Sequence, residues 1–154
     1  MIQTNQPANQ FYVYATAYRG YESQAVNEKM LKGMIAEIRK FPGLYGVIED
    51  EFVAGSFREA GSDVATTERT LRIRCRNEIE ADNVAFLACD RYMQDAVLEV
   101  RSQLHTATLV SYKREGVHGE ITRSRTEIGT LMPVREATGE CWSVDKFGQV
   151  WEVR

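Results

Sequence analysis

The chain has 154 residues, of which 44% are hydrophobic, so it is long enough to bury one sizeable core. Its 22 acidic and 19 basic residues give a net charge of −3, which excludes the strongly basic surface typical of nucleic-acid-binding domains. No apolar run approaches the roughly 20 residues of a membrane helix, and the start MIQTNQPANQ lacks the apolar stretch of a secretion signal. We therefore expect a single domain over residues 1–154, located in the cytoplasm, without a nucleic-acid or membrane partner.

The first part of the chain predicts a strand, a helix and a second, longer strand. Residues 11–20, FYVYATAYRG, alternate in polarity and are rich in β-forming residues, which predicts a strand that ends at Gly20. From Ser23, a suitable N-cap, apolar residues recur at helical spacing until the sequence PG at 42–43. The stretch 44–60, LYGVIEDEFVAGSFREA, is then expected to form a long or broken strand.

The second part repeats the pattern of strand and helix. Residues 69–75, RTLRIRC, place apolar side chains on one face of a strand and arginines on the other. A second helix is expected to begin near Asn77, and the stretch 95–113 is again rich in strand-forming residues. The tail 141–153, CWSVDKFGQVWEV, predicts a β-hairpin that covers a sheet edge, whereas residues 114–140 indicate only loops and weak strands.

The predicted order of elements is strand, helix, two strands, helix and strand. This is the order of ferredoxin-like domains, in which an antiparallel sheet carries both helices on one face. We therefore predict an α+β fold, a ferredoxin-like α/β sandwich with an antiparallel sheet, two helices on one face and a C-terminal β-hairpin extension.

Few side chains suit conventional nucleophilic or metal-dependent catalysis. Cys75, Cys89 and Cys141 are odd in number and show no C-x-x-C spacing, so we interpret them as reduced core residues. The histidines are His105 and His118, too few for a recognisable zinc cluster, and no phosphate-binding or serine-hydrolase motif occurs. His105 is either a general base or, more simply, a strand residue satisfied by a neighbour.

One carboxylate stands at an informative position. Glu68 precedes the arginine-bearing strand and follows the small-residue loop EAGSDVA, so it can face a concave site. By residue type alone it remains an ordinary surface glutamate. Arg72, Arg74 and Arg76 could bind an anion, but a single solvated polar face is the normal expectation for an antiparallel sheet.

Six separated segments together resemble one enzyme family. They are PANQFYV (7–13), PGLYG (42–46), FREA (57–60), TLRIRC (70–75), SQLHTATLV (102–110) and FGQVWEV (147–153). In this order and spacing they resemble the phage-encoded enzymes that degrade S-adenosylmethionine (SAM), long called SAM hydrolases and now understood as SAM lyases. The resemblance spans nearly the whole chain, and it implies a GlnB-like fold assembled as a homotrimer with ligand sites between subunits.

The resemblance also implies a reaction that needs no cofactor or metal. The carboxylate of SAM would attack its own γ-carbon, expel 5′-methylthioadenosine and leave L-homoserine lactone, so that a phage depletes the methyl donor of its host's methylation and restriction. A site that positions the flexible arm and excludes water favours this step, because opposite charges neutralise as the C–S bond breaks. The alternatives are hydrolysis by a water that Glu68 or His105 activates, and a non-enzymatic GlnB-like nucleotide-binding trimer.

The family's key glutamate corresponds to Glu68, which is expected to bind the α-ammonium group of SAM through a charge-assisted hydrogen bond. Two departures from the related sequences are Thr67, where they carry a second glutamate, and Phe57, where they carry a tyrosine. The resemblance therefore predicts Glu68 as the catalytic residue. The predicted substrate-binding residues are Phe57, Arg58, Glu59, Ser62, Thr67, His105 and Thr106.

Overall fold

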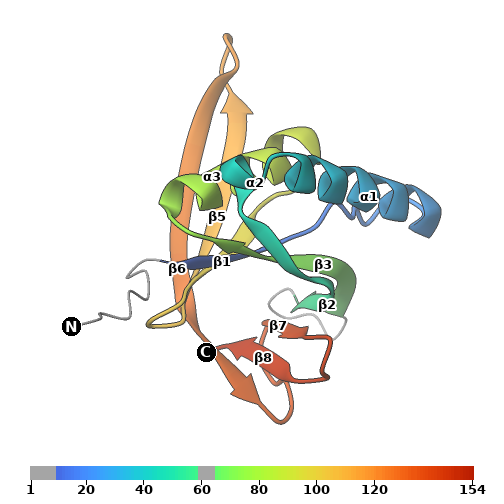
Figure 1. Ribbon diagram of the computed structural model, residues 1–154, viewed down its shortest axis with the longest axis vertical. Helices are drawn as coiled ribbons and strands as arrows, with labels where there is room; N and C mark the ends of the chain where they lie inside the picture. Colours follow the sequence, from blue (N-terminus) through green and yellow to red (C-terminus); the bar gives the residue numbers. More distant parts are fainter. Residues whose placement is uncertain (1–9, 59–64) are drawn as a thin grey trace.

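The computed structural model describes residues 10–58 and 65–154 (Figure 1). Its strands are β1 (Phe11–Ala15), β2 (Val47–Arg58), β3 (Ala65–Cys75), β4 (Val97–Arg101), β5 (Thr106–Glu115), β6 (Glu120–Val134), β7 (Cys141–Val144) and β8 (Val150–Val153). Its helices are α1 (Gln24–Lys40), α2 (Pro42–Tyr45) and α3 (Glu78–Phe86), and α3 continues into the π-helical segment η1 (Leu87–Arg91).

All eight of these strands close into one antiparallel barrel in the order β1-β3-β2-β7-β8-β6-β5-β4. Strand β1 pairs with β3 on one side and with β4 on the other, so the ring has no gap there. The predicted ferredoxin-like, GlnB-like α/β sandwich was therefore wrong. The C-terminal hairpin does not simply extend an open sheet, because β7 pairs with β2 while β8 pairs with β6, and backbone hydrogen bonds join both edges.

Strand β6 is the element that the sequence failed to predict. It runs for 15 residues and pairs with β5 along most of its length, from Thr106↔Thr130 to Glu115↔Glu120. Residues 120–127 are all exposed, so the segment has no buried face to produce an apolar alternation in the sequence. Its order comes from pairing with the neighbouring strand, and the resulting β5–β6 hairpin projects from the body of the molecule (Figure 1).

The main core lies between the helices and the outer surface of the barrel. Leu71, Ile73 and Cys75 of β3 are fully buried there, as the alternation of this strand predicted. Helix α1 contributes Leu31 and Met34, which are also fully buried. A smaller cluster, centred on Val100, Ala107 and Leu131, is packed against partly buried aromatic residues, namely Tyr12, Tyr14 and Trp151.

Local side-chain chemistry sets the start of both long helices, as predicted. Ser23 caps α1, because its Oγ accepts a hydrogen bond from the backbone N–H of Val26 at 3.2 Å. Asn77 caps α3 in the same way, with Oδ1 2.9 Å from the backbone nitrogen of Glu80. No helix in the described part of the chain is long and apolar enough to cross a membrane.

An ion pair between a buried carboxylate and a partly exposed arginine ties the projecting β5–β6 hairpin to the barrel. The carboxylate of Glu99 on β4 is 2% exposed and accepts two hydrogen bonds from Arg125 on β6, at 2.8 and 3.2 Å. Removing one member of a buried pair leaves the other charge without compensation inside the protein. The ion pair between Glu99 and Arg125 therefore links the position of β6 to the stability of the fold, even though most of that strand is exposed.

We expect Arg125→Gln to lower the free energy of unfolding by about 3 kcal/mol, because the Glu99 carboxylate then stays buried without its partner. Urea unfolding measures this loss. The matched control is Arg123→Gln on the same strand, whose pair with Asp82 is more exposed and should contribute less than about 1 kcal/mol. Equal losses in the two variants would contradict a special role for the Glu99 pair.

Candidate functional site

The interior of the barrel holds two cavities that share a wall. The larger, which we call the Arg72 cavity, has a volume of about 580 Å³, and the smaller, which we call the Glu68 cavity, about 460 Å³. Tyr14, Leu131 and Ser143 line both and so lie between them. Burial raises the pKa of the Tyr14 phenol, which therefore stays neutral at physiological pH.

The Glu68 cavity combines apolar walls with acidic charge. Phe57, Val97 and Leu98 supply apolar surface. Among the described residues that line it, the charged side chains are Glu68 and Asp95, both carboxylates. A cavity with this lining suits a small molecule that carries positive charge and apolar surface together.

Strand alternation directs the Glu68 side chain into this cavity. Thr66, Glu68 and Thr70 are alternate residues of β3 and all line it. Gly55 stands opposite Glu68 on β2, and a Cβ at that position would lie 2.6 Å from the Thr70 hydroxyl, so glycine leaves this wall open. Burial raises the pKa of the Glu68 carboxyl above its ordinary value of 4.5, and no described residue donates a hydrogen bond to it.

The residue after Glu68 is held rigidly on the outer face of the barrel. Arg69 Nη1 lies 2.5 Å from Glu28 Oε2 on α1, and its Nε donates to the carbonyl oxygen of Glu51 at 2.9 Å. The Arg69 carbonyl accepts a 2.7 Å hydrogen bond from the Thr16 hydroxyl. These contacts fix the backbone of β3 at Glu68, and none of them involves the Glu68 carboxylate.

The other residues predicted near Glu68 do not all join it. Phe57, which the resemblance predicted to bind substrate, lines the Glu68 cavity. Arg58 instead places its guanidinium 5.2 Å from the centre of the Trp142 ring, and its buried Nε has no hydrogen-bond partner among the described residues. Thr67 points to the opposite face of β3, with its hydroxyl 2.9 Å from that of Ser56. Glu59 and Ser62 lie outside the described residues.

His105 and Thr106 lie away from Glu68 within one chain. His105 lines the Arg72 cavity, is exposed, and has a positive φ of 54° in the turn before β5, so it is not inside a strand. Thr106 begins β5 and pairs with Thr130 of β6. The structure therefore separates these two predicted substrate contacts from the predicted catalytic residue of the same chain.

No motif in the sequence singled out Gln94 and Asp95, yet both line the Glu68 cavity. They belong to the short connection between η1 and β4. The Gln94 side-chain amide donates to the carbonyl oxygens of Tyr18 at 2.8 Å and Tyr92 at 3.2 Å, which holds this connection in place. In the sequence, Gln94 and Asp95 are two adjacent polar residues shortly before β4. Only the order of strands in the barrel brings this end of β4 close to β3.

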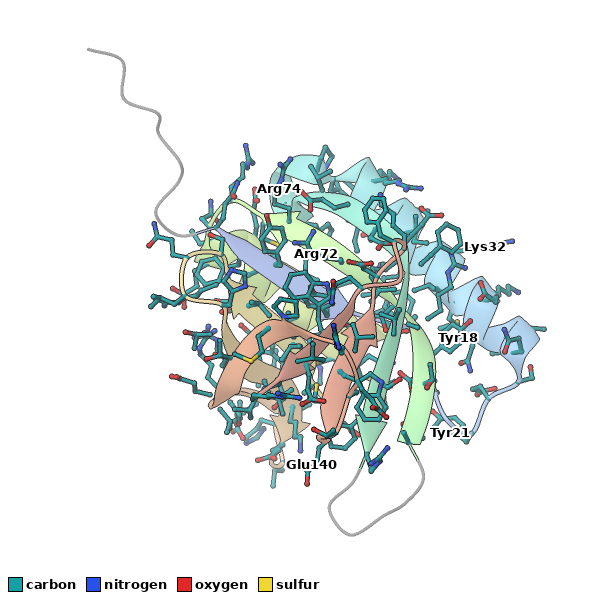
Figure 2. The ribbon with its side chains drawn as sticks, turned by 90° about the horizontal axis from the view of Figure 1, so that it is seen from below. Tyr18, Tyr21, Lys32, Arg72, Arg74 and Glu140 are labelled. Carbon is teal, nitrogen blue, oxygen red and sulfur yellow. The ribbon has the colours of Figure 1, made fainter. Side chains whose placement is uncertain are left out.

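The Arg72 cavity also changes the interpretation of the arginine-bearing face. Viewed from below, Arg72 lies near the middle of the ring of strands, whereas Tyr18 and Lys32 lie beside α1 (Figure 2). Arg72 lines the cavity instead of an open solvated surface. Arg76 keeps a surface position and pairs with Glu80 at 2.6 Å.

Comparison with known proteins identifies the family of the chain. The family model described as S-Adenosylmethionine lyase family matches residues 13–154. The chain is also 39% identical over 160 residues to the S-Adenosylmethionine lyase of Enterobacteria phage T3, with 100% of both chains covered. The chain therefore belongs to the S-adenosylmethionine lyase family and is an enzyme of that kind, which confirms the resemblance found in the sequence.

We expect Glu68→Gln to stabilise the ligand-free protein at neutral pH. The pKa of Glu68 is raised in the folded state, so its contribution to stability is present below the unfolded pKa and is lost as pH rises through the folded pKa. Glutamine removes the cost of ionising a desolvated carboxyl, and its advantage should shrink as the pH falls into the acidic range. Thermal unfolding at several pH values measures this, with exposed Glu136→Gln as the control. A Glu68→Gln variant less stable than wild type at neutral pH would contradict the prediction.

Proposed function

We propose that the protein cleaves SAM to 5′-methylthioadenosine and L-homoserine lactone in its Glu68 cavity. The observation that carries this proposal is that the charged side chains known to line the cavity are both carboxylates. SAM carries a sulfonium and an α-ammonium against a single carboxylate, so its net charge is positive. The cavity volume of about 460 Å³ also lies within the range of roughly 300–1,000 Å³ of small-molecule sites.

The ionised Glu68 carboxylate is suited to hold the α-ammonium group of SAM through a charge-assisted hydrogen bond. With the amino group held, the substrate carboxylate can fold back toward its own γ-carbon. An oxygen–carbon bond then forms while the γ-carbon–sulfur bond breaks, and the electron pair of that bond neutralises the sulfonium. Orientation of this kind contributes up to about 7–11 kcal/mol in the best intramolecular reactions.

The apolar walls of the cavity favour the same step. The ground state contains a sulfonium and a carboxylate, and both charges disappear when the lactone and the thioether form. Phe57 and Leu98 replace water around these groups, and a less polar environment favours the less charged transition state. Glu68 thus acts by binding and orientation, and no proton has to move for the bond to break.

The neighbourhood of Glu68 supports an intramolecular nucleophile. Cys141 lines the cavity, but burial raises the pKa of its thiol, so it is protonated and a weak nucleophile at neutral pH. His105, the histidine considered as a base, lines the other cavity of the chain. Hydrolysis by an activated water therefore has less support than attack by the substrate's own carboxylate.

We also propose that the enzyme works as a homotrimer with its sites between subunits, in the cytoplasm of a phage-infected host. The separation of His105 and Thr106 from Glu68 within one chain supports this arrangement, because a neighbouring subunit can supply contacts that the same chain cannot. Degradation of SAM would withdraw the methyl donor from host methylation and from restriction systems that require it.

Product analysis in ¹⁸O-labelled water tests the reaction. Purified protein incubated with SAM should release 5′-methylthioadenosine together with homoserine lactone. Any homoserine formed by later opening of the lactone should carry the label in its carboxyl group, because water attacks the lactone carbonyl. Label in the γ-hydroxyl group would show direct hydrolysis and contradict the lyase mechanism.

Glu68→Gln should lower kcat/KM by about tenfold to a hundredfold, since a hydrogen bond to a charged group is worth roughly 1.5–3 kcal/mol. Steady-state measurement of methylthioadenosine release gives this ratio. The variant should sediment as the same trimer as wild type, and Glu136→Gln, an exposed neutralisation of the same kind, should keep normal turnover. Near-normal turnover of Glu68→Gln would remove Glu68 from the substrate site.

A further inference from the structure

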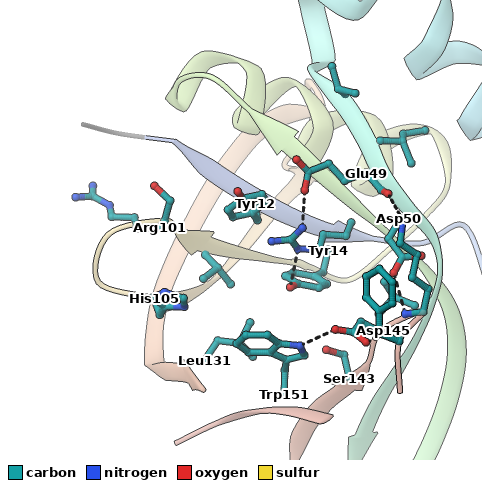
Figure 3. Close-up of a pocket in the computed structure, with 18 residues that line it drawn as sticks. Tyr12, Tyr14, Glu49, Asp50, Arg101, His105, Leu131, Ser143, Asp145 and Trp151 are labelled. Carbon is teal, nitrogen blue, oxygen red and sulfur yellow. Dashed lines mark hydrogen bonds and ion pairs between the residues drawn. The ribbon is translucent and has the colours of Figure 1, made fainter. Parts of the chain in front are cut away.

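The Arg72 cavity contains a guanidinium that is positioned by aromatic and acidic neighbours (Figure 3). Arg72 Cζ lies 3.9 Å from the centre of the Tyr12 ring, and Nε donates to the Tyr14 hydroxyl at 3.2 Å. Its Nη1 lies 2.5 Å from Glu49 Oε2, while Glu49 Oε1 lies 3.4 Å from Arg74 Nε. A single carboxylate, that of Glu49, thus stands between the guanidinium groups of Arg72 and Arg74.

The other carboxylates of the Arg72 cavity are already occupied by donors of the protein. Asp50 accepts backbone hydrogen bonds from Phe52 at 2.8 Å and from Lys146 at 3.1 Å. Asp145 accepts from the Trp151 indole at 3.1 Å and from two backbone N–H groups of its own turn. These donors hold both carboxylates in place in the wall of the cavity.

The cationic side chains of the same cavity are less occupied. Within residues 10–58 and 65–154, Lys146 forms no ion pair, and its Nζ makes one long hydrogen bond of 3.4 Å to the Glu49 carbonyl. Two N–H groups of Arg72 donate to side chains, and its other N–H groups donate to none of the described residues. Arg101 also lines the cavity, but its guanidinium is directed away from the centre (Figure 3). The unused hydrogen-bonding capacity is thus mainly that of donors.

Aromatic rings form the remaining part of the wall of the Arg72 cavity. Tyr12, Tyr14 and Trp151 are partly buried and face the interior beside Arg72 (Figure 3). Rings of this kind stack on planar aromatic groups, and a volume of about 580 Å³ accommodates more than one small ring. We propose that the Arg72 cavity binds an aromatic anion of nucleoside monophosphate size, with its anionic group on Arg72 and Lys146 and its ring against Tyr12 and Trp151.

This site goes beyond the proposed reaction, because its charge preference is opposite to that of the substrate. SAM has a net positive charge and suits the Glu68 cavity, whose charged lining is acidic. The Arg72 cavity offers donors and cationic groups instead. Since Tyr14, Leu131 and Ser143 line both cavities, a ligand in one contacts the wall of the other.

Fluorescence titration of the full chain tests this site. The protein has two tryptophans, so Trp142→Phe leaves Trp151, in the wall of the Arg72 cavity, as the reporter. Adenosine 5′-monophosphate should change this fluorescence saturably. Adenosine, which lacks the anion, and ribose 5-phosphate, which lacks the ring, should each bind at least about tenfold more weakly. No saturable binding of the monophosphate, or equal binding of adenosine, would overturn the proposal.

Charge-removing variants locate the binding, and calorimetry gives each affinity. Arg72→Gln should weaken binding of adenosine 5′-monophosphate at least about tenfold. Lys146→Gln, an exposed change that leaves the fold intact, should weaken it about fivefold. Lys113→Gln, an exposed change outside both cavities, should have no effect. Glu68→Gln should retain the wild-type affinity for the monophosphate. Loss of affinity in Glu68→Gln, or equal affinity in Lys146→Gln and Lys113→Gln, would overturn the assignment.

Discussion

The C-terminal hairpin pairs with two different strands, and this pairing closes the barrel. Strand β7 pairs with β2 and β8 pairs with β6, so the hairpin joins the two edges of what would otherwise be an open sheet. Closure turns the inner face of the sheet into the wall of an interior space. Side chains line this space but do not fill it. Both cavities exist because of this closure, since each takes part of its wall from the hairpin.

Strand β3 connects the core to both cavities through simple alternation. Its outward residues, among them Leu71 and Ile73, are fully buried under the helices and anchor the strand. Its inward residues include Glu68 at one end and Arg72 further along, each in a different cavity. One well-packed strand thus positions an acidic group and a basic group four residues apart on the same face, and places them in two different cavities.

In the Glu68 cavity, the carboxylate that suits a cationic ligand lowers the stability of the ligand-free protein. Burial raises the pKa of Glu68, so an ionised carboxylate at this position costs folding free energy that no described neighbour offsets. A cationic ligand would supply the missing partner. The protein tolerates the cost because Arg69 and the packed outer face of β3 hold the backbone independently of the carboxylate.

Local features could be predicted from the sequence alone: the caps at Ser23 and Asn77, the two faces of β3, and Glu68 as the carboxylate that the family resemblance singles out. These follow from neighbouring residues and from matched segments. The closure of the barrel, the order of β6, and the separation of His105 from Glu68 could be seen only in the folded chain. Pairing between distant strands is made by backbone groups that every residue carries, so it leaves no side-chain pattern from which the sequence could predict it.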